Sequence, residues 1–237
     1  MATMQESEFD KFADEYRAVH ARNIRISGEA PEYFAEYKVK DVADALKKLG
    51  THDKPDLHIL DFGAGVGASV PYFRKHFPVA EVTCLDISRK SLALAAERFS
   101  GLARFVHFDG TSLPFDDCSF DLAFAACVFH HIDHDEHVRL LAEIRRSLRP
   151  RGILFVFEHN PLNPFTVHAV RSCEFDENAQ LIGGLAMKRR LAEAGLAQLK
   201  LRYRLFFPHG LASLRHIERL LTAVPLGAQY YVMAEKP

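Results

Sequence analysis

The chain has 237 residues, of which 48% are hydrophobic and 26% charged, and 30 basic against 31 acidic side chains leave a net charge of −1. Such values are typical of a globular protein and exclude a disordered, collagen-like or coiled-coil chain. The balanced charge provides no general attraction to nucleic acid, so we expect no nucleic-acid partner.

Two amphipathic helices are predicted at the start of the chain, over residues 8–20 and 32–49, because apolar side chains recur there at helical spacing. A polar stretch containing Gly28 and Pro31 separates them. We therefore expect residues 1–50 to form an N-terminal helical appendage and residues 51–237 to form the main domain.

Strands and helices alternate from residue 57 onward. Apolar runs predict strands over residues 57–60, 80–85, 104–108, 120–127 and 153–157. Helical periodicity predicts helices over residues 70–76, 88–99 and 135–148, with Ser88 as an N-cap and residues 149–152 ending the last of these helices. This alternation implies an α/β fold with a doubly wound, mostly parallel sheet. The predicted domain ends with a helix over 185–194, strands over 198–206 and 228–234, and a helix between these strands.

The sequence also predicts where the protein resides. It contains no run of 18 apolar residues, which predicts that no transmembrane helix forms, and its first fifteen residues lack the apolar stretch of a signal peptide. The four cysteines form no CxxC pair. We therefore expect reduced thiols and a cytoplasmic location. The oligomeric state is left open.

A glycine-rich loop follows the first predicted strand of the main domain. Gly63, Gly65 and Gly67 let the backbone turn tightly and approach a ligand, and the loop leads into a helix N-terminus. Gly63, Gly65 and Ala68 also satisfy the dinucleotide pattern GxGxxG/A, with Asp86 about 20 residues further on. Asp61 would repel a pyrophosphate at close range, whereas a ligand with an ammonium group would be attracted to it.

Four motifs in order resemble those of class I S-adenosylmethionine-dependent methyltransferases. They are ILDFGAGVG, CLDIS at 84–88, HFDGTSLPFDDCSFD at 107–121, and LAFAACVFHHI followed by a helix and LRPRGILFVFEH. The resemblance covers about residues 56–160. It implies a Rossmann-like sheet of seven strands in the order 3-2-1-4-5-7-6, with the last strand antiparallel. It also implies S-adenosyl-L-methionine as cofactor and a small or medium-sized acceptor, whose methylated atom (O, N or C) stays undetermined.

The same resemblance implies roles for individual residues. The loop of Gly63, Ala64, Gly65 and Gly67 would lie near the methionine portion, with Asp61 beneath it. Asp86 would accept the ribose hydroxyls and Ile87 would pack on the adenine. The remaining implied cofactor residues are Asp109 and Gly110 at the adenine edge, Ala126 and Cys127 at the methionine end, and Lys38 at the methionine carboxylate.

An N-terminal helical segment often closes the cofactor pocket in this family, so residues 1–50 are expected to act as a lid. Its candidate residues are Tyr16, His20, Tyr33, Tyr37 and Lys38. A second covering segment is expected as an insertion near residues 160–190.

The acceptor side is expected at the carboxyl edge of the sheet, where ligands of doubly wound folds bind. His130 and His131 follow the fourth predicted strand and His159 follows the fifth, so these three are the candidate catalytic residues. Asn160, next to His159, is expected to face the transferred methyl group as well, unless it only forms a turn. An imidazole titrates near neutral pH and can act as a base, which is needed only when the acceptor must lose a proton.

A metal site is not expected from the sequence. The run from His130 to His137 contains four histidines and three acidic residues, but Asp133 or Asp135 better suits the N-cap of the following helix. Two other classes of function stay open: a nicotinamide-dependent oxidoreductase, and a non-catalytic cofactor-binding protein.

Overall fold

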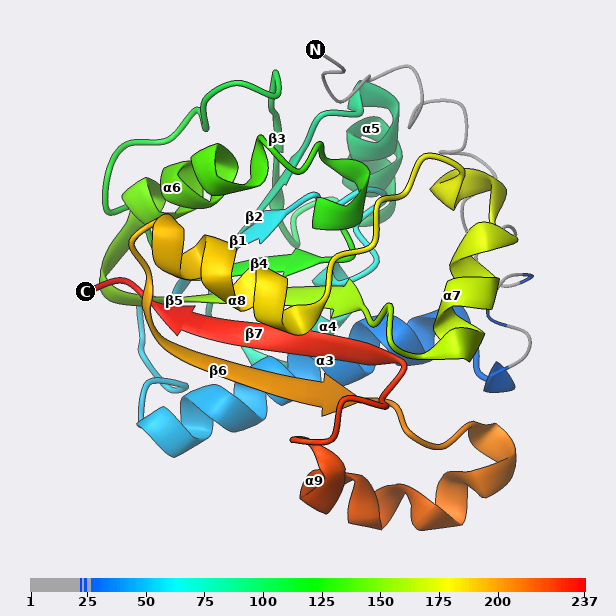
Figure 1. Cartoon of the computed structure of the whole chain (residues 1–237). Helices are drawn as coiled ribbons and strands as arrows, with labels where there is room; N and C mark the ends of the chain where they lie inside the picture. The colour runs from blue at the N-terminus through cyan, green and yellow to red at the C-terminus, as the bar shows by residue number, and fades with distance from the viewer. Residues whose placement is uncertain (1–21, 23, 25–26) are drawn as a thin grey trace.

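The computed structural model describes residues 22, 24 and 27–237 (Figure 1). The predicted helix over residues 8–20 lies outside these residues, and so do the lid candidates Tyr16 and His20.

One sheet of seven strands runs through the centre of the described chain, in the order β3-β2-β1-β4-β5-β7-β6. The strands are β1 (His58–Phe62), β2 (Glu81–Asp86), β3 (Arg104–His107), β4 (Phe120–Ala126), β5 (Leu148–His159), β6 (Ala197–Arg204) and β7 (Gln229–Glu235). The first five strands are parallel to one another, whereas β7 is antiparallel to both β5 and β6. The predicted fold class and the strand order implied by the resemblance are confirmed.

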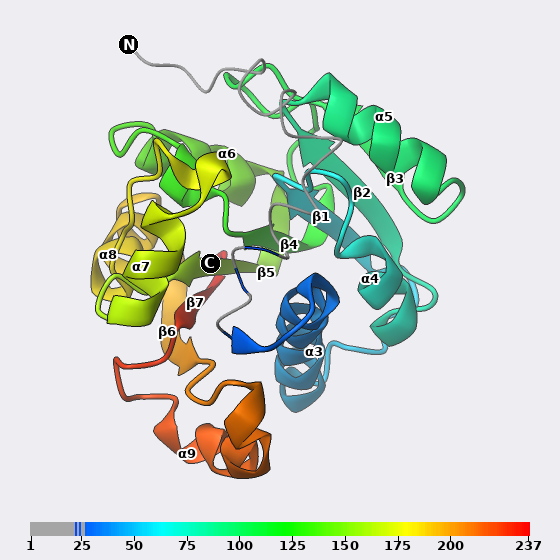
Figure 2. The same cartoon turned by 90° about the vertical axis from the view of Figure 1, so that its right-hand side faces the viewer.

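Helices cover both faces of this sheet (Figures 1 and 2). They are α3 (Pro31–Leu49), α4 (Val70–His76), α5 (Arg89–Arg98), α6 (His137–Ser147), α7 (Pro164–Arg171), α8 (Gly184–Glu193) and α9 (Glu218–Leu221). Apolar side chains of α3 and α4 pack in one core layer with β1, β4 and β5, and those of α6 and α8 pack in a second layer on the other face. The helix α3 is therefore part of the core, because its Val39, Val42 and Ala43 are fully buried.

Two expected boundaries are wrong. The helix α6 begins at His137 with Glu136 at the N-cap position and no side-chain cap, so neither Asp133 nor Asp135 caps it. The fifth predicted strand, 153–157, begins too late, because β5 already starts at Leu148, where Arg151 N–H donates to the carbonyl of Lys236 and Lys236 N–H donates to that of Gly152. Ser88 caps α5 as predicted, since its side chain accepts from Ser91 N.

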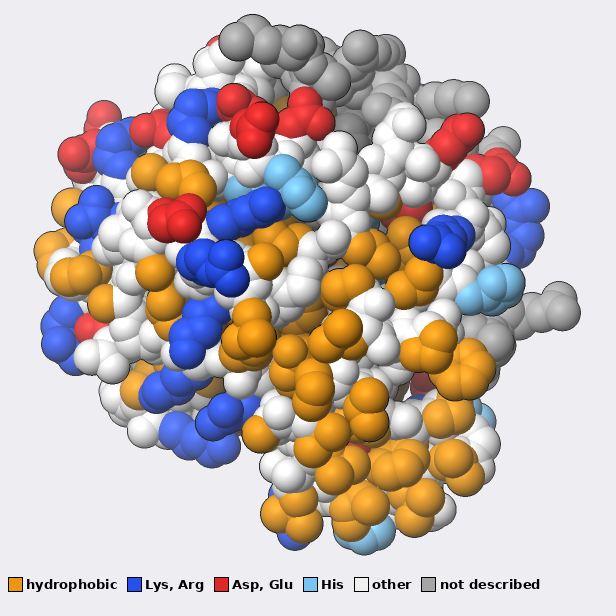
Figure 3. Space-filling model, in the orientation of Figure 1, with side chains coloured by type: hydrophobic (Ala, Val, Ile, Leu, Met, Phe, Trp, Pro, Cys, Tyr) orange, Lys and Arg blue, Asp and Glu red, His pale blue; other side chains and the backbone are white. Residues whose placement is uncertain are grey.

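The segment between β6 and β7 contains a 3-10 helix, η4 (His209–Ile217), followed by the short α9. Hydrophobic side chains gather on the part of the surface that η4 and α9 form (Figure 3), including the exposed Leu211 and Leu220. No described helix is both long and apolar enough to cross a membrane.

Candidate active site

A cavity of about 550 Å³ lies at the carboxyl ends of β1, β2 and β4. Its size is within the usual range for small-molecule sites. Ten of the predicted site residues line it: Lys38, Asp61, Gly63, Ala64, Gly65, Asp86, Ile87, Ala126, Cys127 and His131. The wall also includes aromatic side chains that the sequence did not single out, namely Phe34, Tyr72, Phe99 and Phe108.

The glycines of the loop have three different surroundings. Gly63 has φ 73° and a Cβ built on it would lie 2.4 Å from Val128 Cγ2, so the close approach requires glycine. A Cβ on Gly65 would meet nothing within 4 Å, which means that this position faces open space in the cavity. Gly67 does not line the cavity, because a Cβ there would contact Phe99 and Ala95 of the neighbouring helix region.

Asp86 ends β2 and holds the loop in place. Its Oδ2 accepts a hydrogen bond from Gly65 N at 2.7 Å, and its Oδ1 accepts from Ser88 N at 2.8 Å. The group also lines the cavity, where a ligand can donate to it.

Asp61 is a buried carboxyl group in the cavity wall, only 2% exposed. Its Oδ2 has no hydrogen-bond partner among the described residues. Burial and the nearby Asp86 carboxylate together raise the pKa of Asp61 to about 8, although the Lys38 ammonium opposes the shift. A buried polar atom without a partner is costly, so this oxygen is suited to a donor that a ligand supplies.

Cys127 follows β4 in the left-handed conformation, with φ 58°. Lys38 Nζ lies 3.3 Å from its sulfur and donates to it. Burial by itself would raise the pKa of Cys127, but the Lys38 ammonium and His159 together lower it to about 7. The ammonium group of Lys38 is thus present at the cavity wall, next to Asp61, as an anion-binding group.

Glu158 connects the ends of β4 and β5, although the sequence prediction did not include it. Its Oε1 accepts from the backbone N–H of Val128 at 3.0 Å and of Phe129 at 2.7 Å. Its Oε2 lies 2.6 Å from Nδ1 of the buried His130. Burial opposes ionisation of both groups, yet this ion pair lowers the pKa of Glu158 to about 2 and raises that of His130 to about 10.

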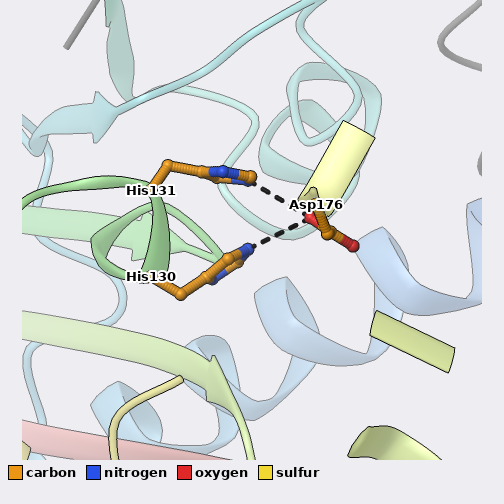
Figure 4. Close-up of side chains that lie close together, drawn as sticks. All are labelled: His130, His131 and Asp176. Carbon is orange, nitrogen blue, oxygen red and sulfur yellow. Dashed lines mark ion pairs between the residues drawn. The ribbon is translucent and has the colours of Figure 1, made fainter. Parts of the chain in front are cut away.

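Three histidines and one aspartate converge behind the cavity wall. The ring centroid of His130 lies 4.1 Å from that of His131 and 5.1 Å from that of His159. Asp176, from the 3-10 turn η3 (Glu174–Asp176), faces the first two rings (Figure 4). His131 lines the cavity, whereas His130 and His159 do not. Burial and the neighbouring His130 lower the pKa of His131 to about 3.

Four more predicted cofactor and lid residues do not line the cavity: Asp109, Gly110, Tyr33 and Tyr37. The exposed Asp109 carboxylate accepts from Thr111 N at 2.8 Å and Thr111 Oγ1 at 2.6 Å. Tyr37 is directed to Gln229, to which its hydroxyl donates, and Tyr33 stacks against Arg215.

Asn160 and two histidines of the run are engaged with the backbone. The amide of Asn160 donates to the carbonyls of Pro225 and Gly227, at 3.0 and 2.8 Å, and so fixes the loop before β7. His134 and His137 face the carbonyls of Gln180 and Ile132.

Several known proteins are similar to this chain in sequence. Residues 60–156 match the family model described as a methyltransferase domain. A protein of Mycolicibacterium vanbaalenii, named an uncharacterized methyltransferase, is 31% identical over 172 residues, which are 67% of this chain and 64% of that protein. A demethylmenaquinone methyltransferase of Thermotoga maritima is 34% identical over 105 residues, 44% of each chain. The chain thus spans less than two thirds of the length of these relatives.

Solved structures share the fold across most of the chain. A Thermotoga maritima S-adenosylmethionine-dependent methyltransferase, described as a possible histamine N-methyltransferase, has a TM-score of 0.66 at 20% identity and covers 98% of this chain and 99% of its own. The strand order and the cavity at the ends of β1, β2 and β4 define a Rossmann-like ligand-binding protein. Residues 60–156 thus match a methyltransferase domain, and the chain has the fold of an S-adenosylmethionine-dependent methyltransferase of known structure.

Proposed function

We propose that the chain transfers the methyl group of S-adenosyl-L-methionine to a small or medium-sized acceptor. The observation that carries the proposal is the buried, unpartnered Oδ2 of Asp61 beside the ammonium group of Lys38. An amino-acid end group brings an ammonium for Asp61 and a carboxylate for Lys38, so both groups of the wall gain a partner of opposite charge. A pyrophosphate would face the Asp61 carboxyl instead, which argues against a nicotinamide cofactor.

The remaining proposed cofactor contacts follow from the cavity wall. Gly63, Ala64 and Gly65 present backbone without a hindering side chain, and Asp86 offers its carboxylate to the ribose hydroxyls. Ile87 and Phe108 provide apolar surface for the adenine. Asp109 and Gly110 directly follow Phe108, which supports a place for them at the rim beside the adenine edge.

At the proposed methionine end, Ala126 and Cys127 also line the cavity. Gly67 acts there indirectly, because its lack of a side chain lets the loop pack close to Phe99. S-adenosylmethionine supplies an activated methyl group on a sulfonium, so the protein has mainly to orient the acceptor and exclude water.

We place the acceptor next to His131, which is the one proposed catalytic histidine in the cavity wall. The His130 ring lies next to that of His131, and the His159 ring lies next to that of His130, so both act as positioning residues. Glu158 orients His130 through Nδ1. A base is needed only for an acceptor that must lose a proton; because burial and His130 hold the pKa of His131 at about 3, His131 orients the acceptor rather than serving as that base. The named methyltransferase relatives of quinone, sterol and glycine type support a small-molecule acceptor.

Two broader expectations also stay proposals. The segment 1–50 would act as a lid, which is supported by Phe34 and Lys38 of α3 in the cavity wall. The insertion near 160–190 would cover the acceptor, which is supported by Asp176 at the histidines. We further propose a cytoplasmic location and no nucleic-acid partner, on the grounds of the cysteine pattern and the balanced charge.

The test is a transfer assay with methyl-labelled cofactor. Purified protein is incubated with the cofactor and with fractions of a small-molecule cell extract, and labelled products are analysed by mass spectrometry. We expect a product that is one methyl group heavier than its precursor, and none with the Asp61→Asn variant as control. Cofactor binding without transfer to any fraction, including lipid fractions, would favour a non-catalytic binding protein.

A further inference from the structure

We propose that Nε2 of His130, Nε2 of His131 and Oδ1 of Asp176 bind a divalent transition-metal ion, zinc foremost. These three ligand atoms lie within 4.8 Å of one another, and Figure 4 shows both imidazoles directed at the same carboxylate. No sequence pattern predicts this site, because Asp176 is far along the chain from the histidine run. The other histidines of the run, His134 and His137, are turned to backbone carbonyls.

Two of the three pairs of ligand atoms lie at distances that fit ligands around an ion. Asp176 Oδ1 lies 3.5 Å from His130 Nε2 and 3.4 Å from His131 Nε2. Hydrogen bonds between such atoms are usually about 2.7–3.2 Å long, so both contacts are longer than a direct bond. A tetrahedral zinc ion with bonds of about 2.0–2.1 Å separates its ligand atoms by roughly 3.3–3.4 Å.

Glu158 prepares His130 as a ligand. A carboxylate only accepts hydrogen bonds, so the 2.6 Å contact places the proton of the neutral ring on Nδ1 and the lone pair on Nε2, which faces Asp176. Metal-binding histidines commonly donate their other ring N–H to a carboxylate in this way. Glu158 is itself held by the backbone N–H groups of Val128 and Phe129, so the orientation of the ring is fixed before any ion binds.

The charge of the cluster also favours a divalent cation. The side chains of Glu158 and Asp176 are only 1% and 10% exposed. Within the described part of the chain, neither carboxylate forms an ion pair with a lysine or arginine, and both face histidines. With two neutral imidazoles the cluster carries a charge of −2, which one divalent ion balances; buried charges need such compensation.

The donor set selects the class of ion. Two imidazole nitrogens and one carboxylate oxygen suit zinc, iron, cobalt or manganese better than magnesium or calcium, which prefer oxygen ligands. Three protein ligands leave a further position for water or substrate, as in catalytic zinc sites. Because His131 lines the cavity, the ion would adjoin the acceptor and lower the pKa of a hydroxyl or water bound to it. Only this last role rests on the proposed methyl transfer.

The test uses the untagged full chain, made metal-free with a chelator and then titrated with Zn²⁺ against a chromophoric competitor. We expect one ion per chain, and Co²⁺ in its place should show the intense visible absorption of a tetrahedral site. The Asp176→Asn and His131→Ala variants should bind at least tenfold more weakly. Glu158→Gln should bind roughly 10–100-fold more weakly, because a neutral amide replaces the carboxylate that accepts from His130 Nδ1–H. His134→Ala, a histidine of the same run outside the cluster, should bind as the wild type does.

Far-ultraviolet circular dichroism shows whether each variant is folded. The titration of the wild type tests the site even if a variant fails to fold. Wild-type protein that binds less than one ion under competition would overturn the proposal, as would equal affinity in the folded Asp176→Asn variant. Cofactor binding is measured separately by calorimetry. Metal-free protein that binds S-adenosylmethionine but no zinc refutes the metal site alone, whereas zinc binding without cofactor binding refutes the proposed function alone.

Discussion

The buried carboxyl of Asp61 predicts that cofactor binding releases a proton. Its pKa of about 8 means that, in the free protein at pH 7, about nine-tenths of the molecules carry the proton. An ammonium group in contact favours the ionised form, so binding should release about 0.9 proton at pH 7 and only about 0.1 at pH 9. The affinity should therefore fall about tenfold for each pH unit below 8.

The assay is calorimetric titration with S-adenosylhomocysteine, the demethylated form of the cofactor, in buffers that differ in ionisation enthalpy. The matched control is Asp61→Asn, which keeps the shape of the side chain and cannot ionise. Subtracting the number of protons that this variant releases on binding from the number that the wild type releases cancels the contribution of the ligand's own amino group. At pH 9 this variant should bind more weakly by about 1.5–3 kcal/mol, since it lacks the charge-assisted hydrogen bond. Equal proton release by the two proteins at pH 7 would refute the role of Asp61.

The same pKa has a consequence for stability. A carboxyl whose folded pKa is raised from 3.8 to about 8 contributes stability that is present below pH 4 and is lost as the pH rises through 8. In thermal unfolding experiments, the melting temperature of the ligand-free wild type should therefore fall relative to that of Asp61→Asn as the pH rises from 4 to 8. A constant difference between the two proteins from pH 5 to 9 would contradict this result.

Three further predictions concern the wall of the cavity. Asp86→Asn should weaken cofactor binding by about 1.5–3 kcal/mol per lost hydrogen bond in calorimetry, and unchanged affinity would exclude Asp86 from the ribose site. Gly63→Ala should lower the melting temperature, because its Cβ would overlap Val128, whereas Gly65→Ala should mainly weaken cofactor binding, because its Cβ would enter the cavity; the opposite pattern would contradict the loop geometry. The rate of Cys127 alkylation, measured by peptide mass spectrometry, should rise with pH with a midpoint near pH 7. Lys38→Met should move this midpoint upward, and an unchanged midpoint would show that Lys38 does not stabilise the thiolate.

The sheet and the glycine loop were predictable from the sequence because they depend on local pattern. Apolar strands such as β4 bury both faces and so appear as continuous apolar runs. The loop after β1 was predictable from three glycines in five residues, each of which has positive φ. The order of the strands came from the resemblance, since alternation of strands and helices leaves several orders open.

The acceptor side was less predictable because it depends on side-chain direction and on distant contacts. The strand ends placed His130, His131 and His159 near one another, but only the structure shows that His131 alone of these faces the cavity. Glu158 offered a signal that was missed, since an acidic residue ending an apolar strand must find a partner when buried. Asp176 offered none, because the chain returns to the histidines only through the packing of α7 and η3.

Local hydrogen bonds explain the residues whose surroundings differ from expectation. Asp109 engages its own turn through Thr111, and Asn160 satisfies two carbonyls before β7. Aspartate and asparagine commonly form such contacts with nearby backbone. A sequence pattern that places them at the sheet edge therefore does not show whether they face a ligand.

Calorimetric titration of the wild-type chain with S-adenosylmethionine, and in parallel with NAD, tests the central claim most directly. Our account predicts stoichiometric binding of S-adenosylmethionine and no detectable binding of NAD, because the Asp61 carboxyl and the Lys38 ammonium match the two charges of an amino-acid end group. Tight binding of NAD without binding of S-adenosylmethionine would contradict it.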